Sequence, residues 1–142
     1  MAQDMSTEEI KVFLTHETRT GKLATVREDG RAHVAPIWFV LDGDDLIFTT
    51  WHTSVKAQNM GRDSRVSLCV DDENPPFAFV IVEGTVVLID DRAECRRWAT
   101  RIAGRYMGED QAEAFGKRNS VEGELLVRLS PTRHIAKKNM AG

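Results

Sequence analysis

Apolar and polar positions along the chain follow two periods, which predict short helices set among many short strands. Near the start, Ser6 and the acidic residues after it form an N-cap pattern, and Ile10, Phe13 and Leu14 then share one helix face. Strands are predicted where β-branched and aromatic residues gather between turn residues. These strands cover residues 21–27, 31–41, 46–51, 64–70, 77–89, 124–129 and 133–136.

Glycine and proline mark the places where this pattern turns or breaks. The Asp29-Gly30 pair predicts a tight hairpin, and residues 42–44 predict a second turn, so that the first three strands form a meander. Pro36 lacks an amide hydrogen, which confines its strand to a sheet edge, a bulge or a place where something other than protein approaches. Gly84 interrupts the longest predicted strand and suggests a bulge that lets a sheet curl into a barrel.

Two further helical regions are predicted. One is capped at Ser54 and ended by Gly61. The other follows Asp91, stops at Gly108 and is succeeded by a shorter helical piece over residues 109–115. One stripe of the helix after Asp91 holds Cys95, Trp98, Ala99, Ile102 and Tyr106, the spacing of a packed face.

Elements and composition together indicate one α+β domain over residues 1–142, a barrel or sandwich with helices packed outside it. Apolar residues make up 42% and charged residues 29%, the balance of an ordinary globular protein. The net charge is -3 and the basic residues are scattered, so no nucleic-acid partner is expected. The longest apolar run, residues 77–82, is too short to span a membrane, and residues 1–4 carry no secretion signal, so the expected location is cytoplasmic.

Several kinds of catalytic chemistry have no support in the sequence. A nucleophile motif, a metal-ligand cluster, a GxGxxG motif and a phosphate-binding loop are all absent, so we expect neither catalytic side chains nor a metal site. Cys69 and Cys95 lack zinc-site spacing and are expected to be buried reduced thiols. The histidines also lack metal spacing; they are His16, His33, His52 and His134.

Residues 49–59, in which a strand ends and a helix begins at once, are a candidate phosphate site. A helix N-terminus offers unpaired amides and a partial positive charge, to which Ser54 adds a donor and Lys56 a cation. Asn59 lies three residues after Lys56, at a neighbouring position of the same helix face. An ordinary capped surface helix has the same pattern, so spacing alone leaves both interpretations open.

Pro36, Ile37 and Trp38 form a second candidate site. A strand broken by proline can leave backbone amides free to bond a planar heterocycle, against which the tryptophan could pack. An edge strand with a core tryptophan explains the same residues. Phe77 and Ala78 are likewise compatible with a plain core position.

Four segments in this order resemble a known family: residues 21–26 (GKLATV), 29–38 (DGRAHVAPIW), 54–60 (SVKAQNM) and 62–68 (RDSRVSL). Together they resemble the pyridoxamine-phosphate-oxidase-like split β-barrel proteins, in particular the deazaflavin-dependent oxidoreductase branch. The resemblance implies an FMN-binding split β-barrel of six to seven antiparallel strands in Greek-key-like order, with peripheral helices. It also implies a homodimer whose cofactor sites lie at the subunit interface.

The resemblance assigns roles to residues of both candidate segments. It implies that the cofactor ring lies beside Pro36, Ile37 and Trp38. It implies that the ribityl and phosphate portion is held by Thr49, Thr50, Ser54, Lys56 and Asn59. Phe77 and Ala78 would come from the partner chain and close the pocket.

Coenzyme F420 is the cofactor that the resemblance favours, with FMN as the alternative. FMN users of this family tend to show an arginine-rich phosphate grip, whereas this chain has Lys56 with Asn59, and its nearest arginine is Arg62. The implied reaction is hydride transfer from reduced F420 to a small unsaturated acceptor such as a quinone, an enone or a tetrapyrrole. An FMN-dependent flavoprotein and a non-catalytic F420 carrier remain the alternatives.

Overall fold

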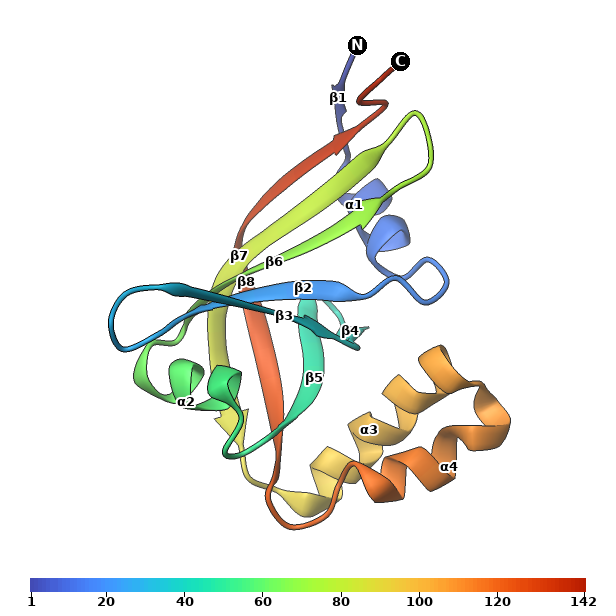
Figure 1. The fold of residues 1–142 in the computed structure, drawn as a ribbon. Coiled ribbons are helices and arrows are strands. Elements are labelled where there is room, and N and C mark those ends of the chain that lie inside the picture. Colours follow the sequence, from blue (N-terminus) through green and yellow to red (C-terminus); the bar gives the residue numbers. More distant parts are fainter.

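The computed structural model describes all residues from Met1 to Gly142 and contains eight strands and four helices (Figure 1). The strands are β1 (Gln3–Asp4), β2 (Gly21–Val26), β3 (Ala32–Ile37), β4 (Val40–Asp42), β5 (Asp45–Trp51), β6 (Arg65–Asp72), β7 (Ala78–Ile89) and β8 (Glu124–Lys138). The helices are α1 (Thr7–Leu14), α2 (Val55–Arg62), α3 (Arg92–Met107) and α4 (Glu109–Arg118). Every strand pair is antiparallel, which confirms the α+β class.

Seven strands follow one path through the sheet, in the order β3-β2-β6-β7-β8-β5-β4, and β1 pairs with β8. β3 and β4, the two halves of the predicted strand 31–41, lie at opposite ends of this path; β3 pairs with β2 and β4 pairs with β5, so both hairpins of the expected meander are present. The predicted strand 31–41 is broken at Trp38 and Phe39, where the chain crosses from one end of the sheet to the other. Three residue steps from Ile37 to Val40 span at most about 11 Å. The two ends of the sheet therefore meet, and the sheet is a barrel.

The bulge predicted at Gly84 is present and lies opposite a proline. β7 and β8 pair along most of their length, with a register shift between Glu83 and Gly84, where Gly84 faces Pro131. A bulge is one of the few places where a strand tolerates proline. For this reason the two strands predicted over 124–129 and 133–136 are one continuous strand, β8.

The main core fills the barrel, and α1 closes over it through Phe13 and Leu14. Its members without exposed surface include Leu23, Phe39, Phe48, Leu68, Val80, Val82 and Leu129. α1 begins with a capping box, in which Ser6 and Glu9 each bond the backbone amide of the other. A smaller core between α3 and the sheet contains Ile47, Cys95, Trp98 and Leu126.

Two helix ends differ from the sequence prediction. Gly61 lies inside α2, which continues to Arg62 and has Asp63 as its C-cap, because the backbone at Gly61 does not adopt the positive φ that ends helices. α4 continues to Arg118, three residues beyond the predicted end. α3 begins after Asp91, as predicted.

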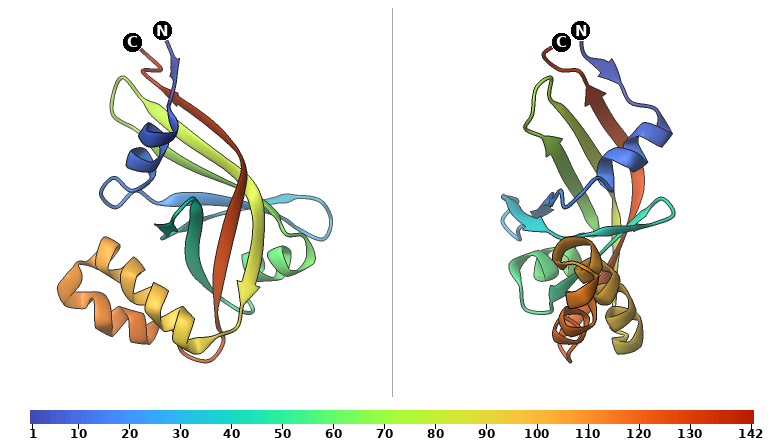
Figure 2. Two further views of the ribbon diagram at one scale, coloured as in Figure 1. Left: turned by 180° about the vertical axis from the view of Figure 1, so that it is seen from behind. Right: turned by 90° about the vertical axis from the view of Figure 1, so that its right-hand side faces the viewer.

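The helices occupy different ends of the barrel (Figure 2). α1 lies near the β6–β7 turn and the two chain termini, whereas α2 and the α3–α4 hairpin lie toward the opposite end. None of the four helices has the length and apolar character needed to cross a membrane.

Candidate functional site

A hollow of about 370 Å³ opens where the ends of β3 and β5, the start of α2 and one side of α3 meet. Seven of the ten residues proposed from the sequence line it: Pro36, Ile37, Trp38, Thr49, Thr50, Ser54 and Lys56. The rest of the lining is Trp51, Ala99, Ile102, Asn119 and Glu124. The two candidate segments, which are separate along the chain, therefore face one cavity.

The start of α2 presents free hydrogen-bond donors at this hollow. Ser54 is the N-cap, and its hydroxyl accepts from the Ala57 amide at 3.2 Å and lies 2.8 Å from the Thr50 hydroxyl. The amides of Val55 and Lys56 have no acceptor within the chain. Together with the positive end of the helix dipole and the Lys56 ammonium, these amides form an arrangement that suits a phosphate.

An aromatic wall stands on another side of the hollow, at the end of β3. Trp38 stacks on Tyr106 of α3 with 5.0 Å between ring centroids and an interplanar angle of 3°. β3 is the last strand of the sheet path, so one edge of its backbone has no partner strand, as Pro36 predicted. This wall can accept a planar ring and can offer it backbone groups.

Glu124 is the acidic residue of the hollow. The pairing of β5 with β8 places it opposite Trp51. Burial raises the pKa of the Glu124 carboxyl, while Lys56 and His52 oppose this rise. When Glu124 is ionised, its carboxylate is a nearby counter-charge for Lys56. An anion that binds at the start of α2 therefore competes with the Glu124 carboxylate for the Lys56 ammonium.

Asn59 does not line the hollow. Its side chain is 3% exposed and points to β2, where its amide donates to the Thr25 hydroxyl at 3.0 Å. Its carbonyl oxygen accepts from Arg62 at 2.9 Å. The structure thus uses Asn59 to fasten α2 to the barrel, although the sequence placed it beside Lys56 as a phosphate ligand.

β7 begins at Ala78, directly after Phe77, and this start lies near the other end of the barrel (Figure 1). Phe77 is 42% exposed. Ala78 lines a separate hollow of about 390 Å³ beside α1. Within one chain, neither residue belongs to the first hollow.

A larger hollow of about 650 Å³ lies over β2, β6 and β7. Its charged residues are Asp63, Arg65 and Glu83. Arg65 forms two hydrogen bonds to the Asp63 carboxylate, at 2.9 and 3.0 Å, and these bonds lower the pKa of Asp63 to about 2. Since its cation is already paired, this surface suits an anionic ligand less well than the start of α2 does.

Five lining residues were not among the ten proposed from the sequence, although Trp51 lies within the candidate segment 49–59. Ala99 and Ile102 belong to the apolar stripe of α3, and periodicity does not distinguish a packed side chain from one that lines a cavity. Asn119 is the C-cap of α4, and Trp51 and Glu124 meet at the hollow because β5 pairs with β8. This pairing is long-range, and no local motif signals it.

Comparison with known proteins identifies the family of this fold. The structure is similar to that of a conserved hypothetical protein from Mycobacterium tuberculosis, Rv2991, with 26% identity, coverage of 96% of this chain and 87% of that chain, and a TM-score of 0.86. An F420 reductase is 26% identical, with coverage of 87% and 94% and a TM-score of 0.71. A FAD-binding protein from Mesorhizobium loti shares the fold at 21% identity, with 96% coverage of both chains and a TM-score of 0.73. Among curated proteins, none matches the sequence.

The sequence itself carries the family assignment. Residues 6–132 match the family described as pyridoxamine 5'-phosphate oxidase. The match extends from the N-cap of α1 into β8, so it includes both walls of the hollow and the long strands between them. The chain belongs to the pyridoxamine 5'-phosphate oxidase family of split β-barrel proteins.

Proposed function

We propose that the protein is a reductase that uses reduced coenzyme F420 to transfer a hydride to a small unsaturated acceptor, such as a quinone, an enone or a tetrapyrrole. The observation that carries this proposal is that the donor-rich start of α2 and the aromatic end of β3 face one hollow. The similarity to an F420 reductase supports the choice of cofactor.

The lining fits the parts of such a cofactor. The unpaired amides of Val55 and Lys56 and the Lys56 ammonium would hold the phosphate, and Ser54 would keep this helix start in place. The ring would lie against Trp38 and the free edge of β3. Thr49 and Thr50, which line the same hollow, would meet the ribityl chain.

The charge of the hollow favours F420 over FMN. Lys56 is the one cation among the lining residues, and no arginine joins it. The FMN users that the sequence resembles tend to grip the phosphate with arginines. Lys56 without an arginine partner therefore supports the deazaflavin.

F420, when bound in reduced form, supplies the hydride from its ring. The residues of the chain would bind the phosphate, orient the ring and keep the acceptor within reach. Ala99 and Ile102 make one side of the hollow apolar, which helps to exclude water. We further propose a homodimer in which Phe77 and Ala78 of one subunit close the hollow of the other.

Titration of the purified protein with F420 and with FMN, followed by fluorescence and absorbance, tests this proposal. Micromolar or tighter F420 binding together with weak FMN binding is expected, and an acceptor screen with reduced F420 should then show turnover. Tight FMN binding would make the protein a flavin-dependent member of the family. F420 binding without turnover of any acceptor would make it a carrier.

Lys56→Ala tests the phosphate position directly. Loss of a charge-assisted hydrogen bond costs roughly 1.5 to 3 kcal/mol, so F420 affinity should fall about 10- to 150-fold. Lys117→Ala, on the exposed side of α4, is the matched control and should bind like wild type. An unchanged affinity in Lys56→Ala would remove the phosphate from this helix start.

A further inference from the structure

Two side chains of α3 hold the connection between β3 and β4, which has no partner strand of its own. The Tyr106 hydroxyl accepts from the Phe39 amide at 3.2 Å and donates to the Arg19 carbonyl at 2.8 Å. Arg105 donates to the Phe39 carbonyl at 2.7 Å. Both backbone polar groups of Phe39 are therefore bonded to consecutive residues of α3.

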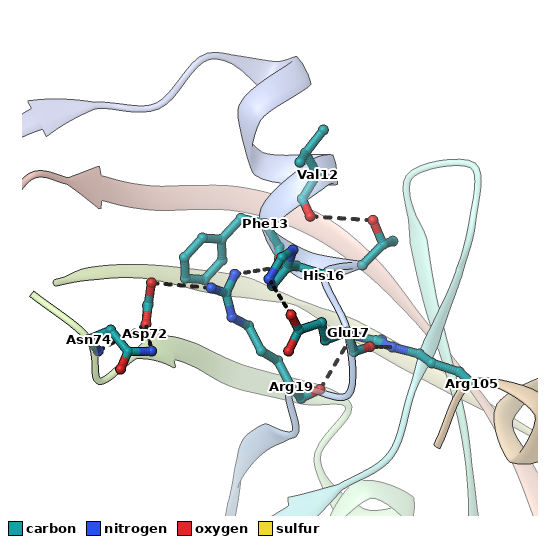
Figure 3. A network of polar contacts seen from close by, with 9 residues as sticks. Val12, Phe13, His16, Glu17, Arg19, Asp72, Asn74 and Arg105 are labelled. Carbon is teal, nitrogen blue, oxygen red and sulfur yellow. Dashed lines mark hydrogen bonds and ion pairs between the residues drawn. The ribbon is translucent and has the colours of Figure 1, made fainter. Parts of the chain in front are cut away.

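Arg105 also holds the loop between α1 and β2 (Figure 3). Its guanidinium donates to the carbonyl oxygens of Glu17 at 2.9 Å and Leu14 at 2.8 Å. Burial lowers the pKa of Arg105, and each of its hydrogen-bond acceptors is a main-chain carbonyl. Arg105 also donates to a fourth carbonyl, that of Arg19, at 3.4 Å. A planar guanidinium with five donors can bond four carbonyls at once, which a lysine ammonium with three donors cannot.

The loop that Arg105 bonds is itself anchored to the sheet. The Arg19 side chain donates to the Phe13 carbonyl at 3.1 Å and pairs with Asp72 of β6 at 3.2 Å (Figure 3). Arg105 thus ties the β3–β4 connection to a fixed part of the barrel.

The residue next to Phe39 is Trp38, whose indole is 39% exposed and lines the candidate cofactor hollow. One face of the indole is covered by the Tyr106 ring. Arg105 and Tyr106 themselves do not line the hollow, so they can affect it through Trp38. We propose that Arg105 and Tyr106 are positioning residues that fix Trp38 as the wall against which the cofactor ring lies. The identity of the ring rests on the proposed function, whereas the placement of the indole does not.

The first test needs no cofactor. The chain has three tryptophans, so the emission of Trp38 must be separated from that of the other two. Wild type and every variant are each made with and without Trp38→Phe, and the difference between the two emission spectra is the signal of Trp38. In Tyr106→Leu and Arg105→Met, this signal should shift to longer wavelength and be quenched more strongly by acrylamide. Arg101→Met is the matched control, because Arg101 lies on the same helix over the ring of Trp98. An unchanged Trp38 signal in folded Tyr106→Leu would overturn the proposal.

The second test measures F420 affinity in a double-mutant cycle. Tyr106→Leu should weaken binding about tenfold, as misplacement of a positioning group does, and the same change in the Trp38→Phe background should have little effect. Equal losses in both backgrounds would show that Tyr106 does not act through Trp38. Failure of the wild type to bind F420 would refute the proposed function, and the emission experiment would still decide the placement of Trp38.

Conservative variants keep the test valid if the larger changes prevent folding. Tyr106→Phe retains the stacked ring and loses both hydrogen bonds, and Arg105→Lys retains the charge and loses most of the carbonyl contacts. Each should show a smaller shift of the Trp38 signal in the same direction. Wild-type emission and affinity in both of these folded proteins would contradict the positioning role.

Discussion

Asn59 joins α2 to β2 through its side-chain amide, and we predict that its loss reduces stability. Asn59→Ala removes the partner of the buried Thr25 hydroxyl and one acceptor of Arg62. The free energy of unfolding should fall by about 2 kcal/mol, as measured by urea denaturation. Gln58→Ala, an exposed neighbour on the same helix, should stay within about 0.5 kcal/mol of wild type.

The affinity of folded Asn59→Ala for F420 separates the structural role from the phosphate role. Near-wild-type affinity is expected, since the amide points to β2 rather than into the hollow. A variant of wild-type stability with lost affinity would make Asn59 a cofactor ligand after all.

The two thiols provide a prediction about pH. Cys95 is buried as predicted, whereas Cys69 is only partly buried. Burial raises the pKa of Cys95 to about 11, with Glu124 and Asp90 adding to the rise, and partial burial also raises the pKa of Cys69. A raised pKa leaves less of the reactive thiolate at any pH below it. At pH 8, iodoacetamide should therefore label the native protein slowly and the urea-unfolded protein quickly, as followed by mass spectrometry. Rapid native labelling of Cys95 would contradict its burial.

Most side chains of the hollow were predictable because they sit at the ends of strongly patterned elements. Asn59 was not, and the reason is geometric. Residues three apart on a helix are offset by about 60° around its axis, so they share a face only approximately. Here Lys56 lies at the hollow and Asn59 turns toward β2. The orientation of a helix about its own axis is set by tertiary packing, which local spacing does not specify.

At the level of elements, Gly84 and Gly61 form a matched pair for a stability prediction. A Cβ atom at Gly84 would overlap the Ser130 carbonyl oxygen and lie 2.9 Å from the Leu129 side chain. Gly84→Ala should lower the free energy of unfolding by about 1 to 3 kcal/mol, because the bulge must open. A Cβ at Gly61, inside α2, meets nothing within 4 Å. Gly61→Ala should raise the free energy of unfolding by about 0.5 to 1 kcal/mol.

Urea denaturation of the two glycine variants beside wild type decides this prediction. Midpoints that move in opposite directions confirm it. A Gly84→Ala protein as stable as wild type would mean that β7 and β8 do not approach as closely at the bulge as described.

The existence of most elements was predictable from the sequence, but their extents were less so. α2 runs through Gly61, where the sequence predicts its end, and β8 runs through Pro131, although the sequence predicts separate strands over 124–129 and 133–136. Each is tolerated for a local reason, the helical backbone at Gly61 and the bulge at Pro131. The two-residue strand β1 depends on its pairing with the distant end of β8 and has no signal of its own.

At the scale of the whole molecule, the order of strands decides where the site lies. The sequence predicts the β2–β3 and β4–β5 hairpins, because their turn residues are local. It does not predict that β2 pairs with β6, or β5 with β8, since those contacts join distant segments. The hollow exists because the barrel brings the end of β3 beside the end of β5 and the start of α2.

The same architecture separates the hollow from Phe77, so a site that uses both requires two chains. In the proposed homodimer, each site combines Lys56 of one subunit with Phe77 of the other. Neither Lys56→Ala nor Phe77→Ala should bind F420 at wild-type affinity. Unfolding and refolding the two variants together should form heterodimers with one intact site and one doubly defective site, restoring about a quarter of all sites.

The number of high-affinity F420 sites in the refolded mixture, measured by titration, tests this arrangement, and sedimentation confirms the dimer. Each variant refolded alone is the control, because its sites all carry the same defect and none should regain affinity. A stable monomer would rule out sites built from two chains. A dimer in which Phe77→Ala alone binds like wild type, so that half of the sites in the mixture bind F420 both before and after refolding, would confine the site to the hollow of one chain and leave Phe77 and Ala78 outside it.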